Sequence, residues 1–217
     1  SGAIRVWDAA TGEAQAQLGA GSEPILAIAL GAGDEILVAA DAEGTVSAWN
    51  LKTEDQLFSV SAHGGAVLSV AVTADGGKVV SSGEDGRVRV SDISTGEALT
   101  EIDASSEAIQ SIAVDKAGGQ LAAGGDDGIL RVFDAESGSE IYSFEGHGAT
   151  ITSVAFGKDE KVVHTASLDG TSRVFQLESG AELAQAVSTK DGWAVYNQEG
   201  DFDGAGDGLE AVAFAAE

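Results

Sequence analysis

Short apolar runs separated by glycine- and aspartate-rich turns dominate the pattern of this chain. In one representative stretch the runs follow one another at residues 66–72, 78–82, 87–92 and 97–102. They are rich in Val, Ile and Ala and too short for amphipathic helices, so they predict β-strands. The turn Glu84-Asp85-Gly86 supplies residues that tolerate the positive φ angles of tight hairpins. We therefore predict four successive antiparallel strands over residues 66–102.

The whole pattern repeats with a period of 42 residues. Glycines recur at this step as Gly2, Gly44, Gly86, Gly128 and Gly170. The residue five positions after each glycine is Trp7, Trp49, Ser91, Phe133 or Phe175. A 42-residue unit of four short strands predicts an all-β fold. The expected architecture is a β-propeller with one four-stranded antiparallel blade for each repeat.

The repeat divides the chain into units. We predict a partial blade at 1–20, full blades at 21–62, 63–104, 105–146 and 147–187, and a C-terminal closing segment at 188–217. Trp193 lies 42 residues after Ile151, which begins the first apolar run of the last full unit, so we expect it to open a further blade. The glycine-rich stretch 203–208 is not expected to form a strand, whereas the apolar run 209–215 is a candidate strand.

The units resemble the WD40-repeat family. The dipeptide that ends the family signature is present as Trp7-Asp8 and is degraded in the later units. Two units contain a histidine close to the Gly-His signature, in Ala62-His63-Gly64 and Gly146-His147-Gly148, and an aspartate follows each histidine after 22 residues. The resemblance covers residues 1–187 and is specific because its motifs are periodic.

In the WD40 family a histidine, a turn aspartate, a strand hydroxyl and a tryptophan form a hydrogen-bonded chain inside each blade. By position, the resemblance implies structural roles for His63, Ser81, Asp85, His147, Thr165, Asp169, Trp7, Trp49, Phe133 and Phe175. Neither histidine unit completes the chain, because Ser91 is too short to replace the tryptophan and Phe175 has no donor. Gly21 and Ser105 replace the histidine in the other two full units. We therefore expect apolar packing between blades to supply most of the stability.

Residues 193–203, Trp-Ala-Val-Tyr-Asn-Gln-Glu-Gly-Asp-Phe-Asp, resemble the segment that closes many bacterial WD-repeat proteins. The resemblance favours a seven-bladed ring, to which this chain contributes four full blades plus two partial ones. A closed five-bladed ring, in which the two ends share one blade and remove exposed strand edges, is an alternative. Assembly with another chain is a third.

The charge balance restricts the partners. With 36 acidic and 11 basic residues, the net charge is −25, which disfavours binding to nucleic acid and to anionic membranes. A marine or salt-adapted source and a simple role in keeping the protein soluble explain this excess of acidic residues equally well. No apolar run reaches the ~20 residues of a membrane helix, so we expect no membrane insertion.

Catalytic and zinc chemistry find little support. His63 and His147 occupy the structural position of the repeat, and His164 lies in a predicted strand. The chain has no cysteine and no G-x-S-x-G motif, so we expect neither a zinc site nor a nucleophile elbow. Arg89, Arg131 and Arg173 recur at the 42-residue step, which predicts a shared structural role in pairing with carboxylates.

One segment carries a possible cofactor site. Calcium-loop spacing, with glutamate in the first place, is present in Glu199, Asp201, Asp203, Asp207 and Glu210. Gly206 stands where such loops carry an apolar residue, and a solvated acidic turn explains the same residues without metal. We otherwise expect no cofactor.

These observations predict a non-catalytic protein–protein interaction scaffold or a structural subunit of a larger complex. The loops at 21–24, 63–65, 105–107 and 147–149 share one predicted face and are the candidate binding surface. The family resemblance adds an alternative, a regulatory or sensor segment of a larger bacterial protein with a caspase-like peptidase or kinase domain. The partner, expected to be a protein, is not specified by the residues, and cytoplasmic, periplasmic and extracellular locations stay open.

Overall fold

The fold consists of β-strands joined by tight turns, as the computed structural model of the chain shows. It describes residues 2–19, 21–31, 33–197, 199 and 201–205. These residues form twenty strands and no helix, which confirms the predicted all-β class. No helix capable of spanning a membrane occurs among them.

The strand bounds follow the 42-residue period. The strands are β1 (Ala3–Trp7), β2 (Ala14–Gly19), β3 (Ile25–Gly31), β4 (Ile36–Asp41), β5 (Thr45–Asn50), β6 (Gln56–Ser61), β7 (Val67–Val72), β8 (Lys78–Gly83), β9 (Arg87–Asp92), β10 (Ala98–Asp103), β11 (Ile109–Val114), β12 (Gln120–Gly125), β13 (Leu130–Asp134), β14 (Glu140–Phe144), β15 (Ile151–Phe156), β16 (Val162–Ser167), β17 (Thr171–Gln176), β18 (Glu182–Ser188), β19 (Trp193–Tyr196) and β20 (Phe202–Ala205). The four strands predicted over residues 66–102 are therefore present as β7–β10, within about one residue at each end.

Successive strands pair antiparallel within separate sheets. β1 and β2 form a two-stranded sheet, and β3–β6, β7–β10 and β11–β14 each form a four-stranded sheet in sequence order. β15–β20 form a six-stranded sheet. The first strand pair of each larger sheet shows the same register shift, for example between Val67 and Ser69, so the repeat extends to the hydrogen-bond pattern.

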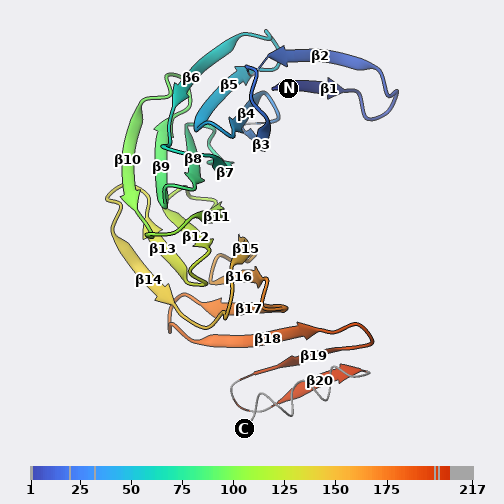
Figure 1. Cartoon of the computed structure of the whole chain (residues 1–217), viewed down its shortest axis with the longest axis vertical. Coiled ribbons are helices and arrows are strands. Elements are labelled where there is room, and N and C mark those ends of the chain that lie inside the picture. The colour runs from blue at the N-terminus through green and yellow to red at the C-terminus, as the bar shows by residue number, and fades with distance from the viewer. Residues whose placement is uncertain (1, 20, 32, 198, 200, 206–217) are drawn as a thin grey trace.

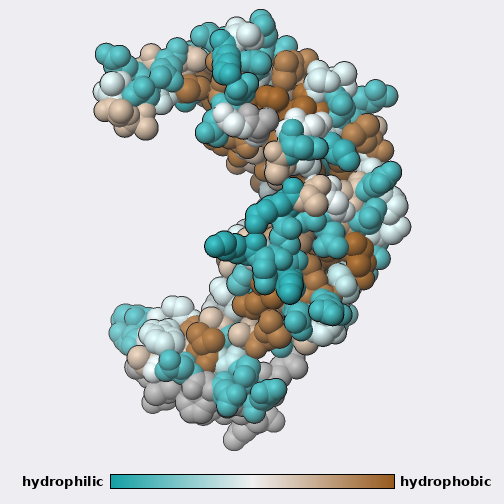
Figure 2. Space-filling model, turned by 180° about the vertical axis from the view of Figure 1, so that it is seen from behind, coloured by the Kyte–Doolittle hydropathy of each residue, from teal (hydrophilic) through white to brown (hydrophobic). Residues whose placement is uncertain are grey.

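The sheets stack side by side along an open arc (Figure 1). The first strands β3, β7, β11 and β15 contact one another in that order, and the outer strands β6, β10 and β14 run along the convex side. The space-filling view from behind shows the same arc, with hydrophilic residues over much of its surface (Figure 2). This arrangement is that of propeller blades around an axis.

The core lies between neighbouring sheets. In one cluster Val38 and Val46 of the β3–β6 sheet pack with Val67 and Val79 of the next sheet, and all four side chains are buried. Equivalent clusters fill the next two interfaces. Burial of each such side chain contributes about 1.5–3 kcal/mol, so inter-blade packing is a major source of stability, as expected.

The C-terminal strands differ from the sequence expectation in two ways. Trp193 does not open a separate blade, because β19 pairs with the outer strand β18 and extends that sheet. Residues 203–205 do form a strand, since β20 pairs with β19 and places Asp203 opposite Val195. Asn197 stabilises the hairpin, because its side-chain oxygen accepts from the amides of Glu199 and Asp201. The candidate strand 209–215 lies outside the described residues.

The described strands do not close into a ring. β1 pairs only with β2, and β20 pairs only with β19, so the two ends of the described chain do not share a blade. The closed five-bladed arrangement is therefore not what the structure shows, and the seven-bladed ring stays a prediction.

Candidate functional site

A buried histidine in the loop before β7 bonds to β8 and to the turn between β8 and β9. His63 Nδ1 lies 2.9 Å from Asp85 Oδ1, and Nε2 lies 2.8 Å from Ser81 Oγ. A carboxylate only accepts hydrogen bonds, so Nδ1 carries the proton and Nε2 accepts from Ser81. The His63 side chain is 0% exposed. Both ring nitrogens are thus engaged inside the sheet, as the sequence comparison implied.

The environment fixes the protonation states of this group. Burial lowers the pKa of His63, and the neighbouring Asp85 compensates only in part. Burial raises the pKa of Asp85, but the hydrogen bonds from His63 and the Gly64 amide outweigh it, so the pKa lies below its ordinary value. A neutral imidazole beside a carboxylate results.

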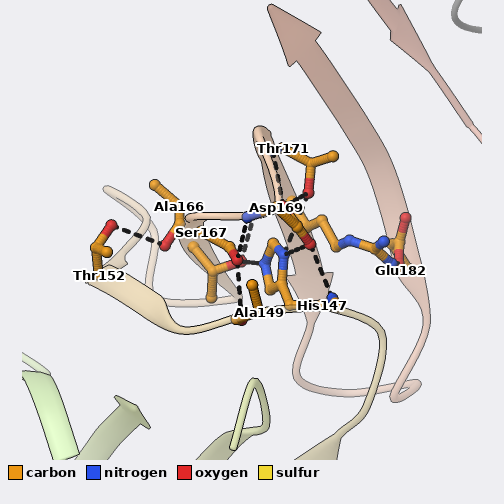
Figure 3. Close-up of polar contacts among 11 residues, drawn as sticks. His147, Ala149, Thr152, Ala166, Ser167, Asp169, Thr171 and Glu182 are labelled. Atoms are coloured by element: carbon orange, nitrogen blue, oxygen red, sulfur yellow. Dashed lines mark hydrogen bonds and ion pairs between the residues drawn. The ribbon is translucent and has the colours of Figure 1, made fainter. Parts of the chain in front are cut away.

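The β15–β20 sheet contains the same arrangement (Figure 3). His147 Nδ1 lies 2.9 Å from Asp169 Oδ2, and Nε2 lies 2.7 Å from Thr165 Oγ1. Thr171 adds a hydroxyl that donates to Asp169 Oδ1 over 2.7 Å. Burial raises the pKa of Asp169, yet the hydrogen bonds from Thr171, His147 and the Gly148 amide bring it far below its usual range. The two networks are equivalent, one turn aspartate fixing one loop in each.

A third unit keeps part of this arrangement without a histidine. Ser105 Oγ donates to Asp127 Oδ2 over 2.9 Å, and Arg131 Nη1 lies 2.6 Å from the same oxygen. The absence of a histidine predicted no network here, although the 22-residue spacing of Ser105 and Asp127 equals that of His63 and Asp85. That spacing was the signal that could have found it. In the first full unit Asp41 instead accepts from the amides of Glu43 and Thr45.

The aromatic positions of the repeat have different environments. Trp49, Phe133 and Phe175 are buried at 2–3% exposure and belong to inter-sheet cores. Trp7 is 55% exposed on the two-stranded sheet, beside a cavity of about 750 Å³. The serine at the remaining position of this series, Ser91, is also buried.

The three periodic arginines pair with carboxylates, which confirms their predicted role. Arg89 pairs with Glu101. Arg131 pairs with Asp127 and, more distantly, with Glu140, and Arg173 pairs with Glu182. Each arginine lies on the third strand of its sheet and holds a carboxylate of a neighbouring turn or of the fourth strand.

Two loops at the network end of the sheets, 62–66 and 104–108, are bonded to both neighbouring sheets. The amides of Ala62 and His63 donate to the Gly44 carbonyl of the preceding sheet, and the Ala66 carbonyl accepts from Glu84 of the following one. Ala104 and Ser105 repeat the first pattern toward Gly86, and the Asp126 amide repeats the second toward Ala108. These loops are therefore held in place by backbone hydrogen bonds as well as by the turn aspartates.

We call this end of the sheets the loop face. It consists of the loops 21–24, 62–66, 104–108 and 145–150 and the turns 42–44, 84–86, 126–129 and 168–170. Its carboxylates are Glu23, Glu43, Glu84, Asp85, Glu107, Asp126, Asp127, Glu145 and Asp169, and these segments contain no lysine or arginine. Five lysines lie in or beside the turns of the opposite end, Lys52, Lys78, Lys116, Lys158 and Lys161, and Lys190 lies in the turn between β18 and β19 at the loop-face end. The loop-face segments are therefore acidic without a basic residue, whereas the opposite turns mix lysines with carboxylates such as Asp34, Glu54 and Asp159.

The calcium candidates are only partly within the described chain. Asp203 lies in β20, Glu199 and Asp201 lie in the hairpin turn that Asn197 caps, and Asp207 and Glu210 fall outside the described residues. No group of three potential metal ligands gathers among the residues described. Calcium binding stays a prediction, which a calorimetric titration with Ca²⁺ would check.

Stacked four-stranded sheets, one for each repeat, with histidine–aspartate–hydroxyl networks at one end, define a β-propeller protein of the WD40-repeat kind. A family model described as outer membrane protein assembly factor BamB matches residues 1–143, and the model of the WD domain, G-beta repeat, matches residues 138–176. The first match spans more than half of the chain, so the chain belongs to that family of propeller repeats. No curated protein matches the chain.

Solved structures support the same fold. The computationally designed Ika8 protein is 25% identical with a TM-score of 0.77, over 89% of this chain and 64% of the Ika8 chain. The designed Ika4 protein is 28% identical with a TM-score of 0.67, over 73% of this chain and 94% of its own. The chain thus spans 64% of the length of Ika8.

Proposed function

We propose that the chain is a non-catalytic scaffold that holds a basic protein segment on its loop face. The main support is the construction of this face, because backbone bonds hold the loops 62–66 and 104–108 against two sheets and turn aspartates accept from the amides of Gly64 and Gly148. A surface held in this way loses little conformational entropy on binding. The matched family descriptions, an outer membrane protein assembly factor and a WD domain repeat, agree with such a role.

The histidines support a structural and not a catalytic use. In His63 and His147 both ring nitrogens have partners within the sheet, and their side chains are 0% and 1% exposed. A general base must present a nitrogen to its substrate, which neither ring does. Propeller repeats of this kind are generally non-catalytic, and the proposal follows that pattern.

The partner class follows from charge. The loop face presents carboxylates without lysine or arginine, whereas the opposite turns carry five lysines that offset part of the negative charge there. A segment rich in lysine and arginine is attracted to the loop face, and nucleic acid is repelled. Membership of a larger complex, and attachment to a peptidase or kinase domain, stay predictions.

A charge-matched pair of variants tests the proposal with a deca-lysine peptide as probe. The loop-face variant carries Glu84→Gln, Glu107→Gln and Glu145→Gln. The control carries Glu97→Gln, Glu136→Gln and Glu178→Gln, three exposed residues in turns at the opposite end. Each exposed charge contributes about 0.2–1 kcal/mol, so calorimetry should show the loop-face variant binding at least about threefold more weakly than the control. Equal affinity of the two variants would contradict the proposal.

A further inference from the structure

Aspartate followed by glycine occurs seven times in the chain, at Asp75, Asp85, Asp127, Asp169, Asp191, Asp203 and Asp207. The two residues of such a pair can react with each other. The glycine amide nitrogen attacks the side-chain carboxyl carbon of the aspartate, water leaves, and a cyclic succinimide forms. Glycine favours this reaction, because no side chain shields its amide nitrogen. Both groups must be free to approach each other, so the fold decides which of the pairs can react.

Both reacting groups are hydrogen-bonded in four of these pairs. In the pairs that begin at Asp75, Asp85, Asp127 and Asp169, the glycine amide donates to the carbonyl three residues before it, over 2.8 to 3.2 Å. The carboxylate Oδ1 of each of these aspartates accepts from the amide two residues after it, over 2.8 to 3.2 Å. The turn must therefore open before either group can move toward the other.

A side-chain donor adds to this protection in each of the four pairs. Thr73 Oγ1 donates to Asp75 over 2.6 Å, and the other three aspartates accept from the histidines or the serine of the loop networks. The hydrogen bond from Thr73 lowers the pKa of Asp75, and at the other three aspartates hydrogen bonds lower the pKa more than burial raises it. Because the ring closes through the protonated carboxyl group, whose hydroxyl leaves as water, a lowered pKa leaves less of the reactive form.

The pair Asp191-Gly192, in the turn between β18 and β19, lacks this protection. The Asp191 side chain is exposed, and within the described chain neither its carboxylate nor the Gly192 amide has a hydrogen-bond partner. The Gly192 carbonyl closes the turn, because it accepts from the Thr189 amide over 2.9 Å and from the Thr189 hydroxyl over 3.1 Å. These bonds leave the nitrogen of the same glycine available to the carboxyl group.

The two remaining pairs are placed differently. Asp203-Gly204 lies within β20, where Gly204 is the neighbour of Ala194 of β19, so strand pairing holds its backbone extended. Asp207-Gly208 lies outside the described residues. Among the pairs that the structure describes, Asp191-Gly192 is thus the one whose reacting groups are held neither by turn hydrogen bonds nor by strand pairing.

We propose that Asp191 is a site of spontaneous isomerisation, which the folded chain converts to isoaspartate ahead of the other described pairs. The Gly192 nitrogen forms a bond to the side-chain carboxyl carbon of Asp191, and the amide proton leaves with the carboxyl hydroxyl as water. A second water molecule then opens the ring. Breaking the new bond restores aspartate, whereas breaking the original peptide bond leaves isoaspartate. Water is released once and taken up once, so the mass is unchanged and no other reagent is needed.

Isoaspartate changes the turn, because the backbone then runs through the aspartate side chain and becomes one carbon longer. β19 begins at Trp193, directly after this turn, and the pairing of Trp193 with Ser188 depends on the turn length. Isomerisation should therefore weaken the pairing of β19 with β18. The sheets β7–β10 and β11–β14, whose Asp-Gly turns are protected, should keep their pairing.

Peptide mapping of the full chain after several weeks at neutral pH, in native buffer and in concentrated urea, tests the proposal. Cleavage after arginine keeps Asp191 inside a peptide, and electron-transfer fragmentation distinguishes isoaspartate from aspartate. In the native chain Asp191 should convert at least about tenfold faster than Asp75, Asp85, Asp127 or Asp169, since reaction at those four requires two hydrogen bonds to break. In urea the five rates should become comparable, because all five aspartates precede a glycine.

Asp191→Glu is the control variant, since a glutamate at this place has to close a larger ring, which forms more slowly. Amide hydrogen exchange in β19 should become faster as the wild type ages and stay unchanged in aged Asp191→Glu. Equal native rates at the five aspartates, or a native excess at Asp191 that persists unchanged in urea, would overturn the proposal. Faster exchange in β19 of aged Asp191→Glu would show that ageing acts elsewhere and would also overturn it.

Discussion

The hydroxyl of Thr165 can be removed with almost no change of shape. Thr165 is 3% exposed, and its Oγ1 lies 2.7 Å from His147 Nε2. Because Asp169 holds the proton on Nδ1, Nε2 is an acceptor, and Thr165→Val leaves it buried without a donor. An unsatisfied buried polar group costs about 1–3 kcal/mol, so we expect the free energy of unfolding to fall by that amount.

Urea denaturation followed by tryptophan fluorescence measures the loss as a lower midpoint with unchanged m value. Thr152→Val is the matched control, since the same chemical change falls on an exposed residue of the same sheet. It should change stability by less than about 0.5 kcal/mol. If the two variants cost the same, the His147 network does not stabilise the fold and the structural role assigned to it is wrong.

Two further predictions concern the loop face. Gly86→Ala should lower the thermal unfolding temperature clearly more than Gly180→Ala does. Both glycines have φ near +70°, where an alanine costs about 1–2 kcal/mol of strain. Only at Gly86 does the new Cβ also fall 2.1 Å from a carbonyl oxygen, that of Ser105. Because the pKa of His63 is lowered in the folded chain, the unfolded chain binds a proton below about pH 6.5 that the folded chain does not bind. The stability that the neutral His63 contributes is therefore fully present above that pH and is lost as the pH falls. His63→Gln should therefore flatten the loss of unfolding free energy between about pH 7 and about pH 5; a slope equal to that of the wild type would exclude the role of this histidine.

The fold was predictable because the signal is periodic. Strand lengths and turn positions are fixed by apolar residues in strict register and by periodic turn glycines such as Gly44, Gly86 and Gly128. No insertion interrupts the 42-residue period. The networks of His63 and His147 could be anticipated from a family resemblance, since only relative position is needed. What the resemblance did not supply is that Ser105, which replaces the histidine, still bonds to the turn aspartate Asp127, because the motif is defined by the histidine and not by the hydrogen bond.

The ends of the array were harder to predict, for a physical reason. Trp193 has the register of a first strand, but register specifies a strand and not its partner. The unpaired edge of a strand can pair with any strand edge nearby. The free edge of β18 is only a short turn away from Trp193, so β19 pairs with β18. Likewise, the glycine-rich sequence after Phe202 argued against a strand, yet the hairpin cap at Asn197 brings its backbone into pairing distance. Such choices depend on which edges are available in space.

Stacking in which each sheet touches only the sheets before and after it has a consequence for dynamics. Neighbouring first strands contact in the order β3, β7, β11, β15, so opening an end sheet breaks one such interface and opening a middle sheet breaks two. Amide hydrogen exchange should accordingly be slowest in β8 and β12 and faster toward either end. The molecule then behaves as a one-dimensional chain of coupled modules that frays from its tips inward.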